Sequence, residues 1–303
     1  WSVMIPTYNC ARFLRETLES VLSQEIDPEE IQIEVIDDCS TSDDPEAVVC
    51  EFGQGRVSFY RKPANAGAIS NFNSCIERST GHYVHILHGD DFIKPGFYRA
   101  IDERAKEHGE EIALFISRCL VVDEQGVLDS LSPRIKELET PSSDPSYMFL
   151  GNSVRTPGCV IKRSFYEQHG GFLTPLVHTA DWEMWARSTA LGKGLFVNEP
   201  LAVYRFFDGN DTGRLVRTGE NIRDYYRLSQ VMADHYSAYP RLQFVHDIAG
   251  IAAEQAERFQ AMGIQDAAEA NRSVMLALQQ EIPVDKMTLP KRVLRKAASL
   301  VGL

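Results

Sequence analysis

The sequence predicts an α/β fold, with an open, mostly parallel sheet flanked by helices and an all-helical extension at the C-terminal end. Two observations carry this prediction. In residues 2–117 short apolar strands alternate with amphipathic helices, and strands separated by helices of this length form parallel β-α-β units. From about residue 217 the apolar pattern becomes wholly helical.

The elements of the first half alternate in a regular way. The expected strands are residues 2–5, 31–37, 56–61, 82–87 and 112–117. The expected helices between and after them are residues 10–24, 44–52, 68–79 and 96–109. Pro45 suits the first turn of the second helix, where its missing N–H costs nothing, and Gly109 suits the end of the fourth.

The second half is less regular. Residues 119–130 predict a hairpin around Gln125-Gly126, and residues 132–146, which are rich in Pro and Ser, are expected to form a mobile surface loop. The remaining elements are expected at 159–172 (strand, then short helix), 181–192 (helix), 195–206 (one or two strands broken by Pro200), and 217–236, 241–262, 265–280 and 290–301 (helices).

Composition narrows the class of protein. The 303 residues are 44% hydrophobic and 24% charged, which is ordinary for a chain with a real core, and no apolar run long enough for a transmembrane span occurs. The six scattered Cys form no CxxC pair, which indicates reduced thiols in a cytoplasmic protein. A net charge of −12 argues against a nucleic-acid partner, so an anionic ligand needs a bridging cation.

Polar side chains gather where three expected strands end. These runs are Pro6-Thr7-Tyr8-Asn9, Asp37-Asp38-Cys39-Ser40 and His88-Gly89-Asp90-Asp91. In open α/β sheets ligands bind beyond the carboxyl ends of the strands. Adjacent carboxylates repel each other, and a cation compensates this repulsion, so Asp90 and Asp91 predict a metal site.

Other residues at these ends fit a flat base and a phosphate. The Tyr8 ring can pack against a base, whereas Asn9 is expected to cap the following helix. One carboxylate of the Asp37–Asp38 pair can accept the N3–H of uracil or thymine, and Asp38 is expected at an exposed strand end; the alternative is that both cap the next helix. Gly67 permits close backbone approach before a helix whose N-terminus favours negative charge.

Four segments resemble glycosyltransferase family 2 in order and spacing: "SVMIPTYNCARFLRETLESVLSQ", "IEVIDDCSTSD", "NAGAISNFNSCIERSTGHYVHILHGDD" and "GGFLTPLVHTADWEMWAR". Each motif alone is weak, but four in register over about residues 2–210 are specific. The resemblance implies the GT-A fold, a Rossmann-like open sheet. It also implies inverting transfer of a hexosyl or N-acetylhexosaminyl group from a nucleotide-diphosphate sugar, with UDP favoured over dTDP or GDP.

The resemblance also implies roles for the site residues. Asp38 is the expected uracil-binding carboxylate, Asn65 and Gly67 lie near ribose and pyrophosphate, and Asp90 ligates the Mn²⁺ or Mg²⁺ that bridges to the diphosphate. Asp181, at a helix start, matches the general base. Pro6 and Tyr8 belong to the nucleotide site, Asp91 contacts the donor sugar or orients a neighbour, and Glu183 is the second-choice base.

The sequence departs from the family pattern at two positions. His88 stands where the first Asp of the metal motif is expected. Three roles are open for it: a hydrogen-bond donor to ribose or diphosphate, a buried structural residue, or a direct metal ligand. The last is possible because Mn²⁺ tolerates imidazole. Phe207 replaces a His, so Arg205 or Arg214 is expected to compensate. Trp182 and Trp185 are either core residues or stack on a sugar.

We expect a glycosyltransferase domain at 1–215, with a nucleotide-binding half (1–110) and an acceptor-binding half (111–215), and a helical region at 216–303. The expected acceptor is a glycan or lipid-linked glycan in cell-surface polysaccharide assembly. The two departures favour one alternative, a catalytically inactive sugar-nucleotide-binding protein. No GxGxxG follows the first strand, as an NAD-dependent enzyme would need, and the Lys-containing phosphate loop of a nucleotidyltransferase is absent too.

The C-terminal stretch from Lys286 to Leu303 carries five basic residues and no acidic ones. Two interpretations stay open. The stretch is either an interfacial helix that reaches a lipid-linked acceptor at the inner membrane face, or a terminal helix packed on the domain or on a second subunit.

Overall fold

The computed structural model describes residues 1–207 and 211–281, so the helix expected at 290–301 and the basic stretch lie outside the described residues. The chain forms two compact units. The first consists of residues 1–145, 153–174 and 184–205, and the second of residues 146–152, 175–183 and the chain from residue 206 onward. Two short segments of the expected acceptor-binding half, 146–152 and 175–183, therefore group with the helical C-terminal region.

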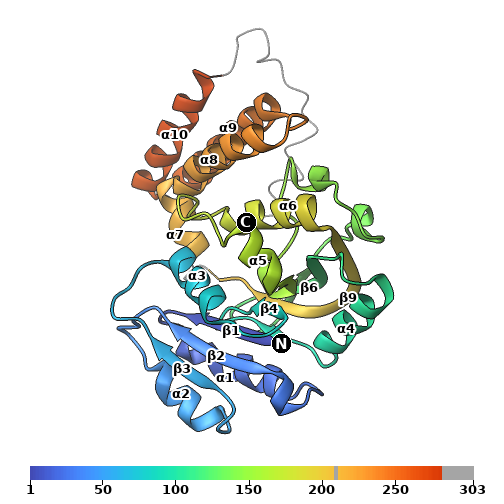
Figure 1. The fold of residues 1–303 in the computed structure, drawn as a ribbon. Coiled ribbons are helices and arrows are strands. Elements are labelled where there is room, and N and C mark those ends of the chain that lie inside the picture. Colours follow the sequence, from blue (N-terminus) through green and yellow to red (C-terminus); the bar gives the residue numbers. More distant parts are fainter. Residues whose placement is uncertain (208–210, 282–303) are drawn as a thin grey trace. The chain divides into compact units, whose positions relative to one another are not determined.

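The first unit is built on one sheet. Four neighbouring strands run parallel in the order β3-β2-β1-β4 (Figure 1). Their bounds are β1 (Ser2–Thr7), β2 (Gln32–Asp37), β3 (Ser58–Arg61) and β4 (Tyr83–Ile86). The order continues β8-β6-β9-β5, with β5 (Phe92–Ile93), β6 (Leu114–Val122), β8 (Cys159–Lys162) and β9 (Gly194–Arg205). The open α/β sheet is confirmed, and its parallel part is the half that the regular alternation predicts.

The second half of the sheet is mixed. β8 pairs antiparallel with both β4 and β6, while β9 pairs parallel with β6. The expected hairpin is confirmed by β7 (Leu128–Leu131), which pairs antiparallel with β6. The expected break at Pro200 is a shift in the β6–β9 register, where Arg118 lies opposite Pro200, and β9 continues through it as one strand.

Helices pack against this sheet through the apolar stripes that the sequence shows. Their bounds are α1 (Ala11–Leu22), α2 (Pro45–Phe52), α3 (Ala68–Arg78), α4 (Phe97–His108) and α5 (Arg163–His169). The boundary between the units falls within a further helix, α6 (Ala180–Gly192). Leu14 and Leu18 of α1 join Val3, Val35 and Phe115 of the sheet in one buried core. Each such side chain contributes roughly 1.5–3 kcal/mol by leaving water.

Residues 132–146 lie at the surface, as expected, but some of their apolar side chains are buried. The side chain of Leu138 is 0% exposed and that of Ile135 is 4% exposed, and a short 3₁₀ turn covers Lys136–Leu138. Ser142 pairs with Gly194 at the start of β9. The high Pro and Ser content of the segment suggested a loop, but the buried side chains of Ile135 and Leu138 anchor it to the protein.

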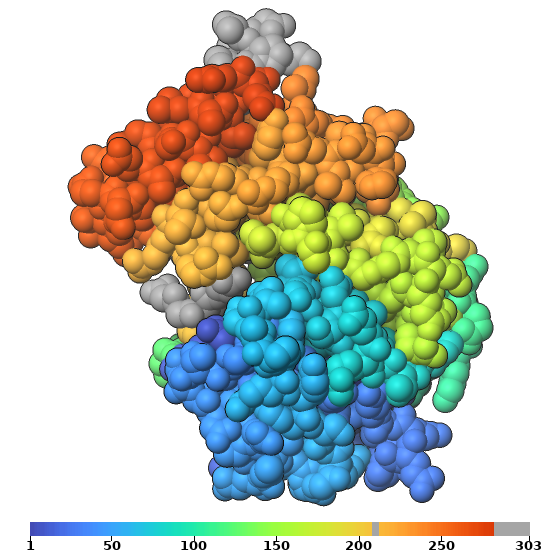
Figure 2. Space-filling model, turned by 60° about the vertical axis from the view of Figure 1, so that its left-hand side comes forward, coloured from blue at the N-terminus to red at the C-terminus, as the bar shows by residue number. Residues whose placement is uncertain are grey.

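The second unit is helical. It contains α7 (Asp211–Thr218), α8 (Glu220–His235), α9 (Arg241–Ala261) and α10 (Gln265–Gln279). The helix expected at 217–236 is interrupted at Gly219, whose φ of 67° is left-handed. α9 and α10, orange and red in Figure 2, pack side by side. Among the helices of the described residues, none has the length and apolarity that crossing a membrane requires.

One buried histidine makes stability depend on pH. Burial lowers the pKa of His85 to about 4, while its ring contacts Tyr98 Oη and the Pro157 carbonyl at 3.0 Å each. The unfolded chain binds a proton below about pH 6.5 and the folded chain does not. We therefore expect the unfolding free energy to fall between pH 6.5 and 4, by about 3 kcal/mol from this group.

Urea titrations at several pH values check this expectation. His85→Phe should flatten the acid slope even though it lowers stability at neutral pH. His82→Gln, at an exposed position just before β4, is the matched control and should keep the slope. Equal slopes in His85→Phe and the wild type would contradict the assignment.

Candidate functional site

The ends of β1 and β2 are joined by side chains that bond to main chain. Asn9 has a φ of 52°, and its Oδ1 accepts the N–H groups of Thr41 and Ser42 at 2.9 and 3.0 Å. The expectation that Asn9 caps α1 is wrong. The N–H of Ala11, the first residue of α1, donates instead to Asp43 Oδ2 at 2.7 Å. A carboxylate 32 residues away therefore accepts a hydrogen bond from the start of this helix.

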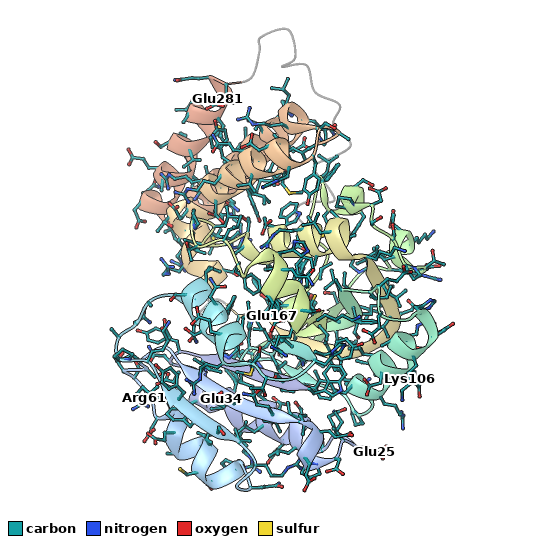
Figure 3. All side chains as sticks on the ribbon, viewed as in Figure 1. Glu25, Glu34, Arg61, Lys106, Glu167 and Glu281 are labelled. Carbon is teal, nitrogen blue, oxygen red and sulfur yellow. The ribbon has the colours of Figure 1, made fainter. Side chains whose placement is uncertain are left out.

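Asp37 and Asp38 are both buried, which corrects the expectation that Asp38 is at an exposed strand end. Asp37 accepts from Arg61 Nε at 2.7 Å; Arg61 is labelled beside β3 in Figure 3. Asp38 is 2% exposed and lies 3.0 Å from Lys62 Nζ. Its oxygens accept the N–H groups of Ala66 at 3.1 Å and Gly67 at 2.8 Å. Asp38 therefore shapes the loop before α3, and its contact with uracil stays a prediction.

The loop that Asp38 holds is open to a ligand. Asn65 and Gly67 are exposed, and Gly67 has a φ of 88° at the start of α3. A Cβ at Gly67 would meet no heavy atom within 4 Å. The first main-chain N–H groups of α3 therefore begin at a point that a ligand can approach closely. Tyr8 is 46% exposed just beyond β1, whereas Pro6 is buried and its carbonyl accepts the N–H of Gly89 at 3.1 Å.

His88, Asp90 and Asp91 form a cluster after β4. One ligand atom from each lies within 4.8 Å of the others. Asp91 Oδ1 accepts the N–H of Arg205 at 2.8 Å, while Asp91 Oδ2 accepts no hydrogen bond from the described residues and lies 3.5 Å from His88 Nδ1. Burial and the Asp91 carboxylate raise the pKa of Asp90 well above its ordinary range. These two carboxylates and the imidazole fit a divalent cation, which would offset the repulsion between the carboxylates and give Asp91 Oδ2 a partner.

The backbone of this cluster is fixed from α1 and β1. Thr17 Oγ1 donates to the Asp91 carbonyl at 2.7 Å. A Cβ on Gly89 would stand 3.0 Å from Cys10 Sγ and 3.2 Å from Thr7 Oγ1, so this glycine allows the loop to approach the end of β1. The His88 ring stacks on Phe72 with 5.0 Å between centroids and 15° between planes, and its side chain is 24% exposed.

Arg205 has a structural role that the sequence did not reveal. Its buried guanidinium is already engaged, which suits it poorly to replace the missing His at the diphosphate, and the alternative, Arg214, stays a prediction. Nε donates to the Asp90 carbonyl at 3.1 Å, Nη1 donates to the carbonyls of Asp123 and Glu124, and Nη2 pairs with Glu16. Arg205 therefore fastens the Asp90–Asp91 loop to the β6–β7 hairpin and α1.

Asp181 lies in the first turn of α6, as predicted. Its Oδ1 accepts the N–H of Trp182 at 2.6 Å, and Asn152 Nδ2 lies 3.4 Å from its Oδ2. Trp182 and Trp185 are buried, so both are packing residues. Glu183 is also buried, which suits it poorly to accept a proton from a bound acceptor. The role of Asp181 as the general base stays a prediction.

Two further side chains, of Asn73 and Arg187, bind main chain far along the sequence. Asn73 on α3 donates to the carbonyl of Phe172 at 3.0 Å and accepts its N–H at 2.8 Å, so Asn73 is a packing residue. Arg187 donates to the carbonyls at the end of α5. In both cases the partner lies too far along the chain for a local pattern to indicate it.

Known proteins resemble this chain in sequence. The model of glycosyl transferase family 2 matches residues 2–157. An uncharacterized protein of Mycobacterium tuberculosis is 28% identical over 238 residues, which are 75% of this chain and 73% of that protein. The minor teichoic acid biosynthesis protein GgaB of Bacillus subtilis is 31% identical over 115 residues, which are 37% of this chain and only 13% of that protein.

Solved structures share the fold. TarS of S. aureus, in complex with UDP-GlcNAc, has a TM-score of 0.58 at 15% identity, and the match covers 93% of this chain and 92% of that one. The mannosyltransferase PcManGT of Pyrobaculum calidifontis, in complex with GDP-Man and Mn²⁺, also has a TM-score of 0.58 at 15% identity and covers 94% and 87%. These matches confirm the GT-A-like fold class.

The burial of Asp38 yields a prediction about stability. Asp38→Ala removes the partner of the buried Lys62 ammonium and leaves the N–H groups of Ala66 and Gly67 without their acceptor. We expect a loss of about 3 kcal/mol in the free energy of unfolding, measured by urea denaturation. Asp44→Ala, which removes the exposed N-cap of α2 and a 3.8 Å surface ion pair with Arg61, is the control and should cost about 1 kcal/mol. Equal losses in the two variants would show that the Asp38 contacts do not stabilise the fold.

Proposed function

The chain belongs to glycosyl transferase family 2, and from that premise we propose that it transfers a sugar from a nucleotide-diphosphate sugar to a hydroxyl of a glycan or lipid-linked acceptor, with inversion. The observation that carries the proposal is the His88–Asp90–Asp91 cluster, placed where the parallel strands of an α/β sheet end. UDP is the favoured nucleotide, and the transferred group is a hexosyl or N-acetylhexosaminyl group.

Donor binding uses the open loop before α3 and the exposed ring after β1. Tyr8 offers a face for the base, and Asn65, Gly67 and the N-terminus of α3 offer donors for ribose and pyrophosphate. Asp38 supports this loop and is the residue proposed to accept the uracil N3–H. The similar fold of TarS, solved with UDP-GlcNAc, supports a nucleotide-sugar donor.

Asp90, with Asp91 and His88, is proposed to hold Mn²⁺ or Mg²⁺. The bound cation supplies neutralisation of the charge that builds on the departing diphosphate. His88 keeps its nitrogens at the cluster because its ring is stacked on Phe72. This orientation supports its role as a ligand or as a hydrogen-bond donor to the diphosphate over a purely structural one. The similar fold of PcManGT, solved with GDP-Man and Mn²⁺, supports the choice of cation.

Asp181 is proposed as the general base. The acceptor hydroxyl loses its proton to the Asp181 carboxylate while its oxygen bonds to the anomeric carbon and the bond from that carbon to the diphosphate oxygen breaks. One displacement of this kind inverts the configuration. General-base assistance contributes about 10²–10⁴-fold in rate.

We place the reaction in cell-surface polysaccharide or glycan assembly on the cytoplasmic side of the membrane. The matched segment of GgaB, named for minor teichoic acid biosynthesis, supports this setting. A peripheral membrane contact or an oligomer contact through Lys286–Leu303 stays a prediction, since that stretch lies outside the described residues.

A second candidate function is sugar-nucleotide binding without catalysis. His88 and Phe207, which stand where the family pattern has Asp and His, favour it. The two candidates differ in one measurement. An enzyme releases nucleoside diphosphate from its donor, whereas a binding protein is stabilised by the donor but does not turn it over.

Two substitutions separate the proposed roles. Asp181→Asn keeps the shape of the side chain and removes its basicity, so transfer should fall about 10²–10⁴-fold while donor affinity stays near that of the wild type. Asp90→Asn should weaken metal-dependent donor binding as well as turnover. Turnover is measured as nucleoside diphosphate release from a panel of UDP-, dTDP- and GDP-sugars, and affinity by thermal shift with Mn²⁺ and Mg²⁺.

Glu25→Gln, which changes an exposed carboxylate labelled in Figure 3, is the matched control for both changes and should leave binding and turnover unchanged. Wild-type turnover by Asp181→Asn would place the base elsewhere. Donor binding by the wild type with no release from any donor would favour the second candidate.

A further inference from the structure

The three residues Val177, His178 and Thr179, which lie just before α6, are held by one carboxylate. Asp224, on α8, is 0% exposed. Its Oδ1 accepts the N–H of Val177 at 3.1 Å, and its Oδ2 accepts the N–H groups of His178 and Thr179, both at 2.8 Å. Thr179 Oγ1 donates to the same oxygen at 2.9 Å. Four donors from three consecutive residues thus converge on a single buried side chain.

This arrangement stabilises both the start of α6 and the buried Asp224 carboxylate. The main-chain N–H groups at a helix start lack partners within the helix, and a negative charge is favourable there. A buried carboxylate in turn needs several donors to offset its lost hydration. Arg227 adds a further contact to Asp224 Oδ1 at 3.2 Å. Arg227 also pairs with Glu220, which lies one turn before Asp224 on α8.

The segment that Asp224 holds leads directly to Asp181. The Thr179 carbonyl accepts the N–H of Glu183 at 3.0 Å, which is the first hydrogen bond of α6, so Thr179 stands at the start of the helix. Asp181 follows two residues later. The Trp182 indole N–H also donates to the Met148 carbonyl at 2.6 Å. Contacts outside α6 therefore hold the main chain just before Asp181 and the side chain of Trp182 just after it.

We propose that Asp224 is a positioning residue for the general base. It acts through Asp181 by fixing the main chain at the start of α6. This inference rests on the proposed role of Asp181. A general base must stand within hydrogen-bond distance of the proton that it accepts, and a displacement of about 1 Å costs about 10²-fold in rate.

The test uses the full chain and the variant Asp224→Asn. An Asn side chain offers one acceptor oxygen in place of two, so Val177, His178 and Thr179 can no longer all be satisfied. We expect release of UDP from the donor that the wild type uses to fall about 10²-fold in kcat, with donor affinity unchanged. We also expect faster hydrogen exchange of the main-chain N–H groups from Val177 to Glu183. Asp234→Asn, an exposed change on the same helix, is the matched control and should change neither quantity.

A double-mutant cycle with Asp181→Asn distinguishes positioning from a general loss of folded protein. If Asp224 acts through Asp181, Asp224→Asn should cost little further turnover once Asp181 is Asn. Additive losses, or unchanged hydrogen exchange at the start of α6, would overturn the proposal and leave Asp181 as the base. Wild-type turnover in Asp181→Asn would overturn the proposed base itself, and this inference with it.

Discussion

Two adjacent carboxylates, Asp90 and Asp91, lie in a half-buried loop and need positive charge nearby, and several elements of the first unit hold this loop in place. Asp90 and Asp91 follow β4, where burial and mutual repulsion raise the pKa of Asp90. The loop is nevertheless held in place. Thr17 bonds to it from α1, and Arg205 bonds to it from the end of β9. Elements far apart in the sequence thus hold two adjacent carboxylates in place. The pKa of Asp90 is raised, and one Asp91 oxygen accepts no hydrogen bond from the described residues, which supports the proposed cation site.

Carboxylates elsewhere in the chain do a different kind of work, and their hydrogen-bond partners reveal the difference. Asp37, Asp38 and Asp224 are buried, and each accepts several main-chain or cationic donors. Such groups hold loops, because several donors of the protein converge on their oxygens. Asp91 retains an oxygen that accepts no hydrogen bond from the described residues. Residue type alone does not separate these two groups.

Local patterns therefore predicted the fold well and the supporting contacts poorly. Period-two and period-3.6 apolar spacing located the parallel strands and the helices, because burial of one face depends on neighbouring residues. The two-residue strand β5 was missed, since it is too short to show a period. Asp43 at the start of α1 and Asp224 at the start of α6 were missed for another reason. Each carboxylate caps a helix that is distant from it in the sequence. The sequence signals for a helix cap consider only residues next to the helix, so they cannot find such partners.

The departure at His88 has a consequence for charge. A triplet of carboxylates would leave a net negative charge after it binds a divalent cation, whereas two carboxylates and a neutral imidazole are balanced by the same cation. A balanced cluster repels an incoming diphosphate less. If His88 is a ligand in the proposed cation site, the site has one oxygen ligand fewer, which would favour cations that accept nitrogen, such as Mn²⁺, over Mg²⁺. The stack on Phe72 matters for this reason: it fixes the imidazole plane, so that a ring nitrogen, which has a single direction of approach, stays aimed at the cluster.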